Sequence, residues 1–262
     1  MSTTLPSRAR FYGCGLPSFE DLELGGPLIV IEGSDCSGRS TQAEMLKESL
    51  ESAGHAVLEM GIRRSDLLGK AISSAKQGNL LGKTTLSLLY ATDLADQLEN
   101  RIVPAMQAGF VVLADRYIYT LMARDLARGA DLKWLKRLFG IALEPDLIIY
   151  LDAEPEVLFY RTLDKYGELN YWESGMDLQM GSSMFESFLK YQASLRKHFH
   201  RLAKEYGFRM VDATPGPKKI HREISGIVSE YLENLVQQSP RPEQPEAQLG
   251  SAANRRVRLE EG

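Results

Sequence analysis

The chain is predicted to adopt an α/β fold of three layers, in which a five-stranded parallel sheet is covered by helices on both faces. Two observations predict this fold. Apolar runs rich in β-branched residues alternate with helical patterns along the chain, as in sheets buried on both sides. The chain has 262 residues, of which 44% are hydrophobic, and this suits one domain with a sizeable core.

The predicted elements follow a regular order of strand and helix. The strands are expected at 28–32, 54–60, 110–114, 146–151 and 208–211. The helices are expected at 39–52, 65–76, 84–107, 119–128, 131–143, 154–164, 182–206 and 218–235. Parallel sheets of this type bind ligands at the carboxyl ends of their strands. Gly33, Asp115, Asp152 and Asp212 are therefore expected at the ligand-binding edge.

Three segments do not fit this alternation. Residues 1–26 have no sustained period and are expected to form an extension that packs locally through Phe11, Tyr12 and Phe19. Residues 237–262 are rich in Gln, Pro, Glu and Arg, a composition typical of disorder. The stretch at about 166–181 is polar and aromatic with three glycines, and we expect a mobile loop there. The folded domain is thus predicted to span 27–236.

Composition and charge exclude several classes of protein. The net charge of −4 gives no broad basic surface, so nucleic acid is not expected as the main partner. No apolar run approaches the roughly 20 residues that cross a bilayer, and the N-terminus has no signal-peptide pattern. Cys14 and Cys36 lie far apart in the sequence, which favours a reducing compartment. We therefore expect a cytoplasmic protein that binds no membrane.

The clearest chemical signal is the stretch 33–41, called the phosphate loop below. Gly33 and Gly38 bracket a short loop between the first strand and its helix. Glycines let the backbone wrap around phosphate oxygens, and the helix N-terminus favours negative charge. Arg39 stands where the pattern has lysine, and the hydroxyl of Ser40 is a candidate ligand for Mg²⁺. The alternative is a tight turn without a ligand, which the position of this motif in the first strand–helix turn disfavours.

A second signal comes where the strand at 110–114 ends. It is followed by Asp115, Arg116 and Tyr117. If this strand neighbours the first one, a carboxylate and a guanidinium lie beside the phosphate loop. Asp115 is then placed to hold hydrated Mg²⁺, and Arg116 to bind a phosphate through two hydrogen bonds. The alternative is a simple Asp–Arg ion pair that closes the strand.

Together with three further stretches, these motifs resemble the thymidylate kinase family. The matching stretches are Glu32–Gln42, Leu88–Asp93, Asp115–Tyr117, Pro145–Asp152 and Val211–Thr214. They occur in the family's order and cover the chain from about Pro27 to Leu235. The resemblance implies the P-loop NTPase fold with a lid at about 166–181. It also implies transfer of the γ-phosphoryl group of Mg-ATP onto dTMP, and a homodimer paired through the helices after the second and third strands.

The resemblance also implies a role for each matched residue. ATP would bind through Gly33, Ser34, Asp35, Cys36, Ser37, Gly38, Arg39, Ser40 and Thr41, with Thr214 near the adenine. The metal would be held by Ser40 and Asp115, and the catalytic cations would be Arg39, Arg116 and Arg161. The nucleoside monophosphate would bind through Asp35, Arg63, Tyr90, Arg116 and Arg124. Among these, Asp35 would meet the deoxyribose, Tyr90 would stack on the base, and Arg116 would bind the acceptor phosphate.

Several positions depart from the family pattern. Arg39 replaces the lysine of the phosphate loop, and Leu94 replaces an arginine that reads the base. Arg124 and Asp125 replace other groups around the base, and the lid sequence 168–173 has no arginine. Two further hypotheses therefore stay open beside dTMP kinase activity. One is a nucleotide-binding paralogue with weakened catalysis, and the other is a kinase for a different nucleoside monophosphate.

Overall fold

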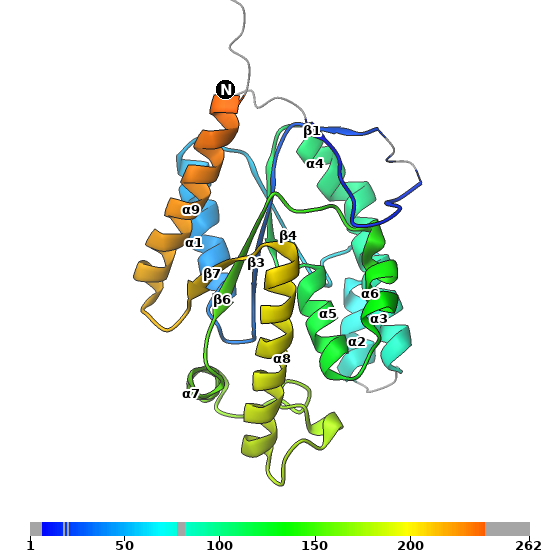
Figure 1. Ribbon diagram of the computed structural model, residues 1–262, viewed down its shortest axis with the longest axis vertical. Coiled ribbons are helices and arrows are strands. Elements are labelled where there is room, and N and C mark those ends of the chain that lie inside the picture. The colour runs from blue at the N-terminus through cyan, green and yellow to red at the C-terminus, as the bar shows by residue number, and fades with distance from the viewer. Residues whose placement is uncertain (1–6, 18, 20, 78–81, 239–262) are drawn as a thin grey trace, which may run out of the picture.

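The computed structural model describes residues 7–17, 19, 21–77 and 82–238 (Figure 1). Its central sheet contains, in spatial order, β4 (Val57–Gly61), β5 (Val111–Asp115), β3 (Leu28–Gly33), β6 (Leu147–Asp152) and β7 (Arg209–Asp212). All neighbouring strands in this sheet are parallel. The predicted α/β fold with a five-stranded parallel sheet is therefore confirmed. The predicted strand ends differ from the observed ones by no more than three residues.

Alternate residues of the central strand face the two helix layers. Ile29 and Ile31 of β3 belong to one apolar cluster, whereas Leu28 and Val30 belong to the other. All of β3 is buried, which explains its unbroken apolar sequence. The first cluster is covered mainly by α1 (Arg39–Ser52) and α9 (Pro217–Gln238). Figure 1 shows these two helices together on one side of the sheet.

The opposite face carries the larger helix layer. Its helices are α2 (Gly69–Gln77), α3 (Lys83–Gln97), α4 (Val103–Gln107), α5 (Ile118–Ala127), α6 (Leu132–Leu138) and α8 (Met184–Tyr206). The helix predicted at 84–107 contains a π-helical turn, η1 (Leu98–Ile102), between α3 and α4. Pro104 in the first turn of α4 explains it, because proline lacks an N–H and its ring clashes with the preceding helical turn. The helix predicted at 131–143 ends earlier, in the 3₁₀ turn η2 (Phe139–Ile141).

The segment before the sheet packs on the end opposite the carboxyl ends of the strands. It forms a small antiparallel pair, β1 (Ser7–Arg8) and β2 (Glu23–Leu24). Phe11, Tyr12 and Phe19 pack against the main core of the domain, whereas the sequence predicted local packing within the extension. At the other terminus α9 includes residues 237 and 238, and the remainder of the tail predicted at 237–262 lies outside the described residues.

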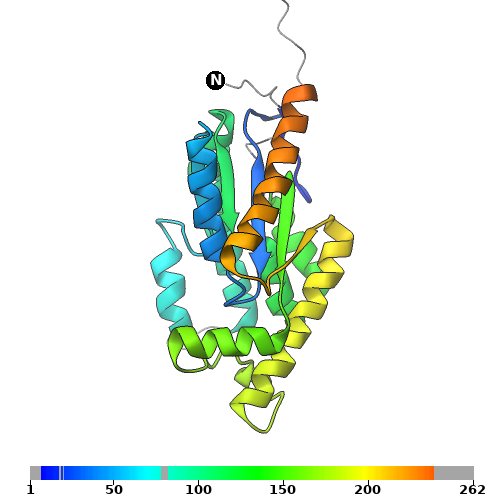
Figure 2. The same cartoon turned by 90° about the vertical axis from the view of Figure 1, so that its left-hand side faces the viewer.

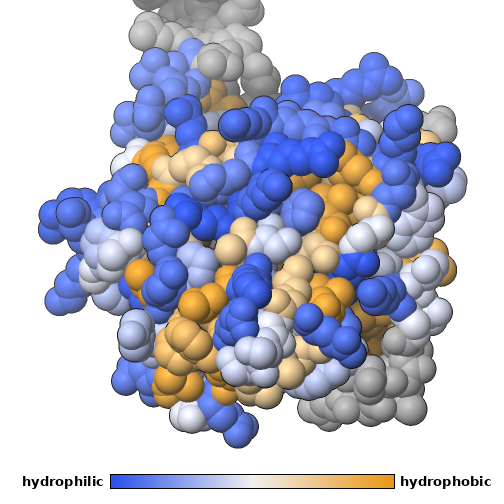
Figure 3. All heavy atoms as spheres, turned by 60° about the horizontal axis from the view of Figure 1, so that its bottom comes forward, coloured by the Kyte–Doolittle hydropathy of each residue, from blue (hydrophilic) through white to orange (hydrophobic). Residues whose placement is uncertain are grey.

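The carboxyl ends of the strands face α7 (Pro155–Tyr166), the segment after it and the start of α8. Figure 2 shows α7 crossing beneath the sheet. Residues 166–181, called the lid segment below, contain the 3₁₀ turn η3 (Met176–Leu178). In Figure 3, which brings this end forward, hydrophobic patches lie among hydrophilic side chains. Within the described ranges, no helix has the length and apolar character needed to cross a membrane.

Candidate active site

The phosphate loop connects β3 to α1 at the carboxyl end of the central strand. Gly38 caps α1 with a left-handed φ of 96°, a conformation that favours glycine. The loop is closed by a hydrogen bond from the Ser37 N–H to the Ser34 carbonyl, at 3.2 Å. The first N–H groups of a helix have no partner within the helix. The loop and the start of α1 therefore offer a site for an anion.

Arg39 turns inward from the first turn of α1 and is 6% exposed. Its Nε donates to Asp115 Oδ1 at 2.6 Å, and its Nη1 donates to the carbonyls of Gly33 and Ser34 at 2.5 and 3.2 Å. Ser40 Oγ donates to Asp115 Oδ2 at 2.8 Å. Asp115 reaches this place because β5 pairs with β3 and sets Asp115 opposite Ile31. The expected neighbourhood of the phosphate loop and Asp115 is therefore confirmed.

A second cluster at the phosphate loop, apart from the Arg39–Asp115 pair, joins two arginines to one carboxylate. Asp35 Oδ1 accepts a hydrogen bond from Arg116 Nη2, and Asp35 Oδ2 accepts one from Arg124 Nη2 at 2.6 Å. The three side chains are 17–19% exposed. These three side chains together carry a formal charge of +1 in a largely buried cluster, while Glu32 and Glu173 act on Arg116 from farther away. Such a cluster attracts an anion with several oxygens, such as a phosphate.

Arg116 has features that favour the binding of an anion. Its backbone has a left-handed φ of 74°, which costs a non-glycine residue about 1–3 kcal/mol. Its Nε is buried without a hydrogen-bond partner among the described residues. Burial, reinforced by the neighbouring charge of Arg124, lowers the pKa of Arg116 to about 9. An anion at this position would supply both the hydrogen-bond acceptor and the countercharge.

A buried carboxylate fixes the backbone that follows Arg116. Glu32 is fully buried at the end of β3 and accepts hydrogen bonds from the N–H groups of Tyr117 and Thr120, at 2.9 and 3.0 Å. Thr120 Oγ1 donates to its other oxygen at 2.5 Å. Glu32 thus satisfies donors at the start of α5 and ties this helix to the central strand.

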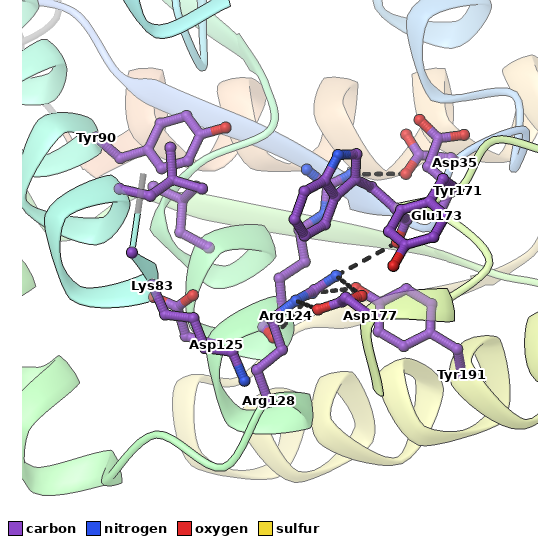
Figure 4. A pocket seen from close by; sticks show the side chains of 14 residues that line it. Asp35, Lys83, Tyr90, Arg124, Asp125, Arg128, Tyr171, Glu173, Asp177 and Tyr191 are labelled. Carbon is purple, nitrogen blue, oxygen red and sulfur yellow. Dashed lines mark hydrogen bonds and ion pairs between the residues drawn. The ribbon is translucent and has the colours of Figure 1, made fainter. Parts of the chain in front are cut away.

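A cavity of about 340 Å³ opens next to the Asp35 cluster (Figure 4). Its walls come from α3, α5, α8, the phosphate loop and the lid segment. The lining residues are Asp35, Gly82, Lys83, Leu86, Tyr90, Leu121, Arg124, Asp125, Arg128, Tyr171, Trp172, Glu173, Asp177 and Tyr191. Tyr90 lies across the cavity from Asp35 and also borders a small adjoining cavity with Arg116. The structure thus brings together Asp35, Tyr90, Arg116 and Arg124.

The other expected residues lie at two different places. Arg161 on α7 donates from Nη2 to the Thr214 carbonyl at 3.3 Å, so these two residues meet, and neither is among the residues that line the cavity. Arg63 is not one of the described residues that line the cavity. Its N–H donates to Asp93 Oδ2 at 2.9 Å, and Asp93 also accepts from the Ser65 N–H. Asp93 therefore holds the loop after β4.

Sequence reasoning missed several residues of the cavity wall. Lys83 and Tyr90 are seven residues apart on one face of α3. Leu121 on α5 and Arg128, which directly follows α5, have the same spacing. This helical spacing is the signal that could have found Lys83 and Arg128. Ser87 Oγ donates to Asp125 Oδ2 at 2.6 Å, and burial raises the pKa of Asp125 above its ordinary value. No local pattern points to Asp177 or Tyr191.

Comparisons with known proteins agree on one family. The model of the thymidylate kinase family matches residues 31–224. The chain is 36% identical to a probable thymidylate kinase 2 of Saccharolobus solfataricus, over 80% of this chain and 99% of the relative. It is 33% identical to a probable thymidylate kinase of Pyrococcus horikoshii, over 80% of this chain and 99% of the relative. It is 32% identical to a thymidylate kinase of Halothermothrix orenii, over 76% of this chain and 94% of the relative. The chain therefore belongs to the thymidylate kinase family.

Proposed function

We propose that this protein transfers the γ-phosphoryl group of ATP to dTMP and produces dTDP and ADP. The observation that supports the proposal best is the convergence of Arg116 and Arg124 on Asp35. Asp35 belongs to the phosphate loop and also lines the cavity. A nucleotide in the cavity would therefore hold its phosphate next to a donor phosphate on the loop. Such positioning of the two reactants is the main requirement of phosphoryl transfer.

The acceptor would occupy the cavity with its phosphate on Arg116. The unpartnered Nε of Arg116 supports this assignment, since a dianionic phosphate would accept its hydrogen bond and neutralise the surplus charge. Tyr90, which is 7% exposed, offers an aromatic ring to the base. Asp35 would accept a hydrogen bond from a sugar hydroxyl, and Arg124 would contact the nucleotide from α5. For Arg63 only the resemblance supports a role.

The donor nucleotide would occupy residues 33–41, with Thr214 near its adenine. The free N–H groups at the start of α1 would bind its phosphate oxygens. Arg39, Arg116 and Arg161 would supply positive charge around the transferred group, where charge develops in the transition state. Arg39 is paired with Asp115, so we propose that its main role is to fix the loop and the candidate metal ligand.

The residues at the loop fit a bound Mg²⁺. The Ser40 hydroxyl and the Asp115 carboxylate lie 2.8 Å apart, and Mg²⁺ prefers such oxygen donors together with water and phosphate oxygens. A bound Mg²⁺ neutralises phosphate charge and holds the phosphates in a fixed geometry. The protein's own part is to hold Asp115 in place through Arg39 and β5.

The kinase unit would span residues 27–236, and we propose that it forms a homodimer through the helices after β4 and β5. Two exposed apolar side chains support this surface: Leu67 before α2 and Leu88 on α3, which are 70% and 49% exposed. Light scattering at several protein concentrations tests the dimer. A single mass equal to that of one chain at all concentrations would exclude it.

An ADP-release assay with a panel of nucleoside monophosphates tests the proposed function. We expect the highest kcat/KM with dTMP and a large loss in the Arg116→Ala variant. Arg222→Ala, an exposed change on α9, serves as the matched control and should behave like the wild type. Turnover of another nucleoside monophosphate in preference to dTMP would show that the natural acceptor is a different nucleotide. The absence of turnover with every member of the panel would overturn the proposal and favour a nucleotide-binding paralogue.

A further inference from the structure

Arg128, on the turn that follows α5, is the centre of a hydrogen-bond network behind the cavity. Its Nε and Nη2 donate to the two carboxylate oxygens of Asp177, at 2.9 and 3.2 Å. Its Nη1 donates to the hydroxyl of Tyr191 at 2.5 Å and to the Arg124 carbonyl at 3.3 Å. Its Nη2 also donates to the Trp172 carbonyl at 3.3 Å. All five N–H donors of one guanidinium are therefore used.

This network joins the lid segment to two helices. Figure 4 shows Arg128 reaching to Asp177 beside the ring of Tyr191. The Arg128 guanidinium lies 5.0 Å from the centre of the Tyr191 ring and 6.0 Å from that of Trp172, distances typical of cation–π contacts. Arg128 and Asp177 are each 12% exposed. A partly buried pair with two parallel hydrogen bonds is stronger and more directional than a surface ion pair.

The backbone of the lid segment is held at three successive carbonyl groups. Arg128 donates to the carbonyl of Trp172, Gln192 Nε2 to that of Glu173 at 2.9 Å, and Ser187 Oγ to that of Ser174 at 2.7 Å. Gln192 and Ser187 come from α8, whereas Arg128 follows α5. Side chains of separate elements thus fix the same short stretch.

The packing beneath this stretch leaves no spare room. Gly175 has a left-handed φ of 60°, and a Cβ added there would lie 2.7 Å from Cβ and Cγ of Tyr191. Residues 166–181 also contain no lysine or arginine. This segment therefore brings no positive charge of its own to a transferred phosphoryl group, whereas Tyr171, Trp172, Glu173 and Asp177 line the cavity.

We propose that Arg128 is a positioning residue that holds residues 171–177 against α8 and the end of α5, so that they form a pre-organised wall of the acceptor cavity. The proposal rests on the proposed function, because it takes the cavity to be the acceptor site. It implies that Arg128 serves acceptor binding by pre-organising the wall, without touching the reacting atoms. ATP binding at the phosphate loop does not depend on it.

Tryptophan fluorescence and steady-state kinetics test this proposal together. The chain has two tryptophans, and Trp134→Phe on α6 leaves Trp172 as the single reporter in the wall. In this background we compare Arg128→Ala, Arg128→Lys and Asp177→Asn, with Arg222→Ala as the control. The readouts are the emission maximum of Trp172, its quenching by acrylamide, and the kcat and KM values with dTMP and Mg-ATP. Arg128→Lys and Asp177→Asn keep the test decisive if Arg128→Ala does not fold.

The proposal predicts a selective effect on the acceptor. In Arg128→Ala we expect Trp172 emission to move to longer wavelength, quenching to increase, and KM for dTMP to rise about tenfold or more. KM for ATP should stay within about twofold. Arg128→Lys should show an intermediate effect, because one ammonium cannot reach both Asp177 oxygens and Tyr191.

Three results would overturn the proposal. Unchanged Trp172 emission would show that Arg128 does not hold the wall. An emission change without a rise in KM for dTMP would show that the wall does not serve the acceptor. An equal rise in both KM values would indicate general damage. If the wild type phosphorylates no monophosphate, the proposed function fails, while the fluorescence still decides whether the segment is docked through Arg128.

Discussion

Arg39 and Asp115 form a largely buried ion pair beside the phosphate loop, with 2.6 Å between Nε and Oδ1. The two residues lie 76 positions apart, and they meet because β5 pairs with β3. The same arginine holds the carbonyls of Gly33 and Ser34. One side chain therefore fixes the loop backbone and orients the candidate metal ligand.

The first prediction concerns the charge at position 39. Arg39→Ala removes the cation and its three hydrogen bonds, and kcat should fall by about 100-fold or more. Arg39→Lys keeps a cation that can reach a phosphate but cannot hold Asp115 and both carbonyls together. Its kcat should stay within about tenfold of the wild type, while its melting temperature falls. Equal losses of kcat in both variants would show that geometry, and not charge, matters here.

The second prediction concerns the metal ligand. Asp115→Asn weakens both the candidate Mg²⁺ site and the contact with Arg39. We expect the Mg²⁺ concentration for half-maximal rate to rise about tenfold or more, as measured by titration at saturating nucleotides. Asp66→Asn, at an exposed position before α2, is the control and should leave this concentration unchanged. An unchanged Mg²⁺ requirement in Asp115→Asn would exclude Asp115 as a metal ligand.

The third prediction is a pH dependence at the cavity wall. Burial raises the pKa of Asp125 in the folded state. The protonated carboxyl group of Asp125 is therefore favoured in the folded state. The stability that this preference contributes is fully present below the unfolded-state pKa of about 4, and it is lost as the pH rises through the higher folded-state pKa. Asp125→Asn stays neutral and can still accept the hydrogen bond from Ser87.

Urea unfolding at two pH values checks this expectation. Asp125→Asn should raise the free energy of unfolding at pH 7 by about 1 kcal/mol, and the gain should disappear near pH 4. The acceptor preference should weaken at the same time, because the variant loses a carboxylate of the cavity wall. A variant that is less stable than the wild type at pH 7 would contradict the assigned cost of burying this charge.

The fourth prediction concerns the packing of Gly175 against Tyr191. Gly175→Ala combines a left-handed backbone with a contact of 2.7 Å, so the free energy of unfolding should fall by about 3 kcal/mol. Gly54→Ala is the matched control, since Gly54 has a φ of 89° and no neighbour within 4 Å. It should cost about 1 kcal/mol. Equal losses in the two variants would show that the Tyr191 contact is not tight.

Much of the fold follows from local sequence. The unbroken apolar run of β3 reflects its burial on both faces, and Gly38 reflects the left-handed cap of α1. The meeting of Asp115 with the phosphate loop depended on which strands are neighbours, and the pairing of β5 with β3 confirms that expectation.

Other features depend on contacts that no local pattern records. The inward turn of Arg39 requires a carboxylate 76 positions away, and Arg128 meets Asp177 across 49 positions. The polar and aromatic composition of residues 166–181 suggested a mobile loop. The groups that hold Trp172, Glu173 and Ser174 come from α8 and from the end of α5, so composition alone could not indicate them.

Transfer of label from ATP to dTMP tests the central claim most directly. The purified full chain is incubated with Mg-ATP labelled at the γ-phosphate and with dTMP, and the products are separated by anion-exchange chromatography. We predict label in dTDP in equal amount to the ADP formed, and its loss in Arg116→Ala. Label that appears only as inorganic phosphate, or that stays in ATP, would contradict the account.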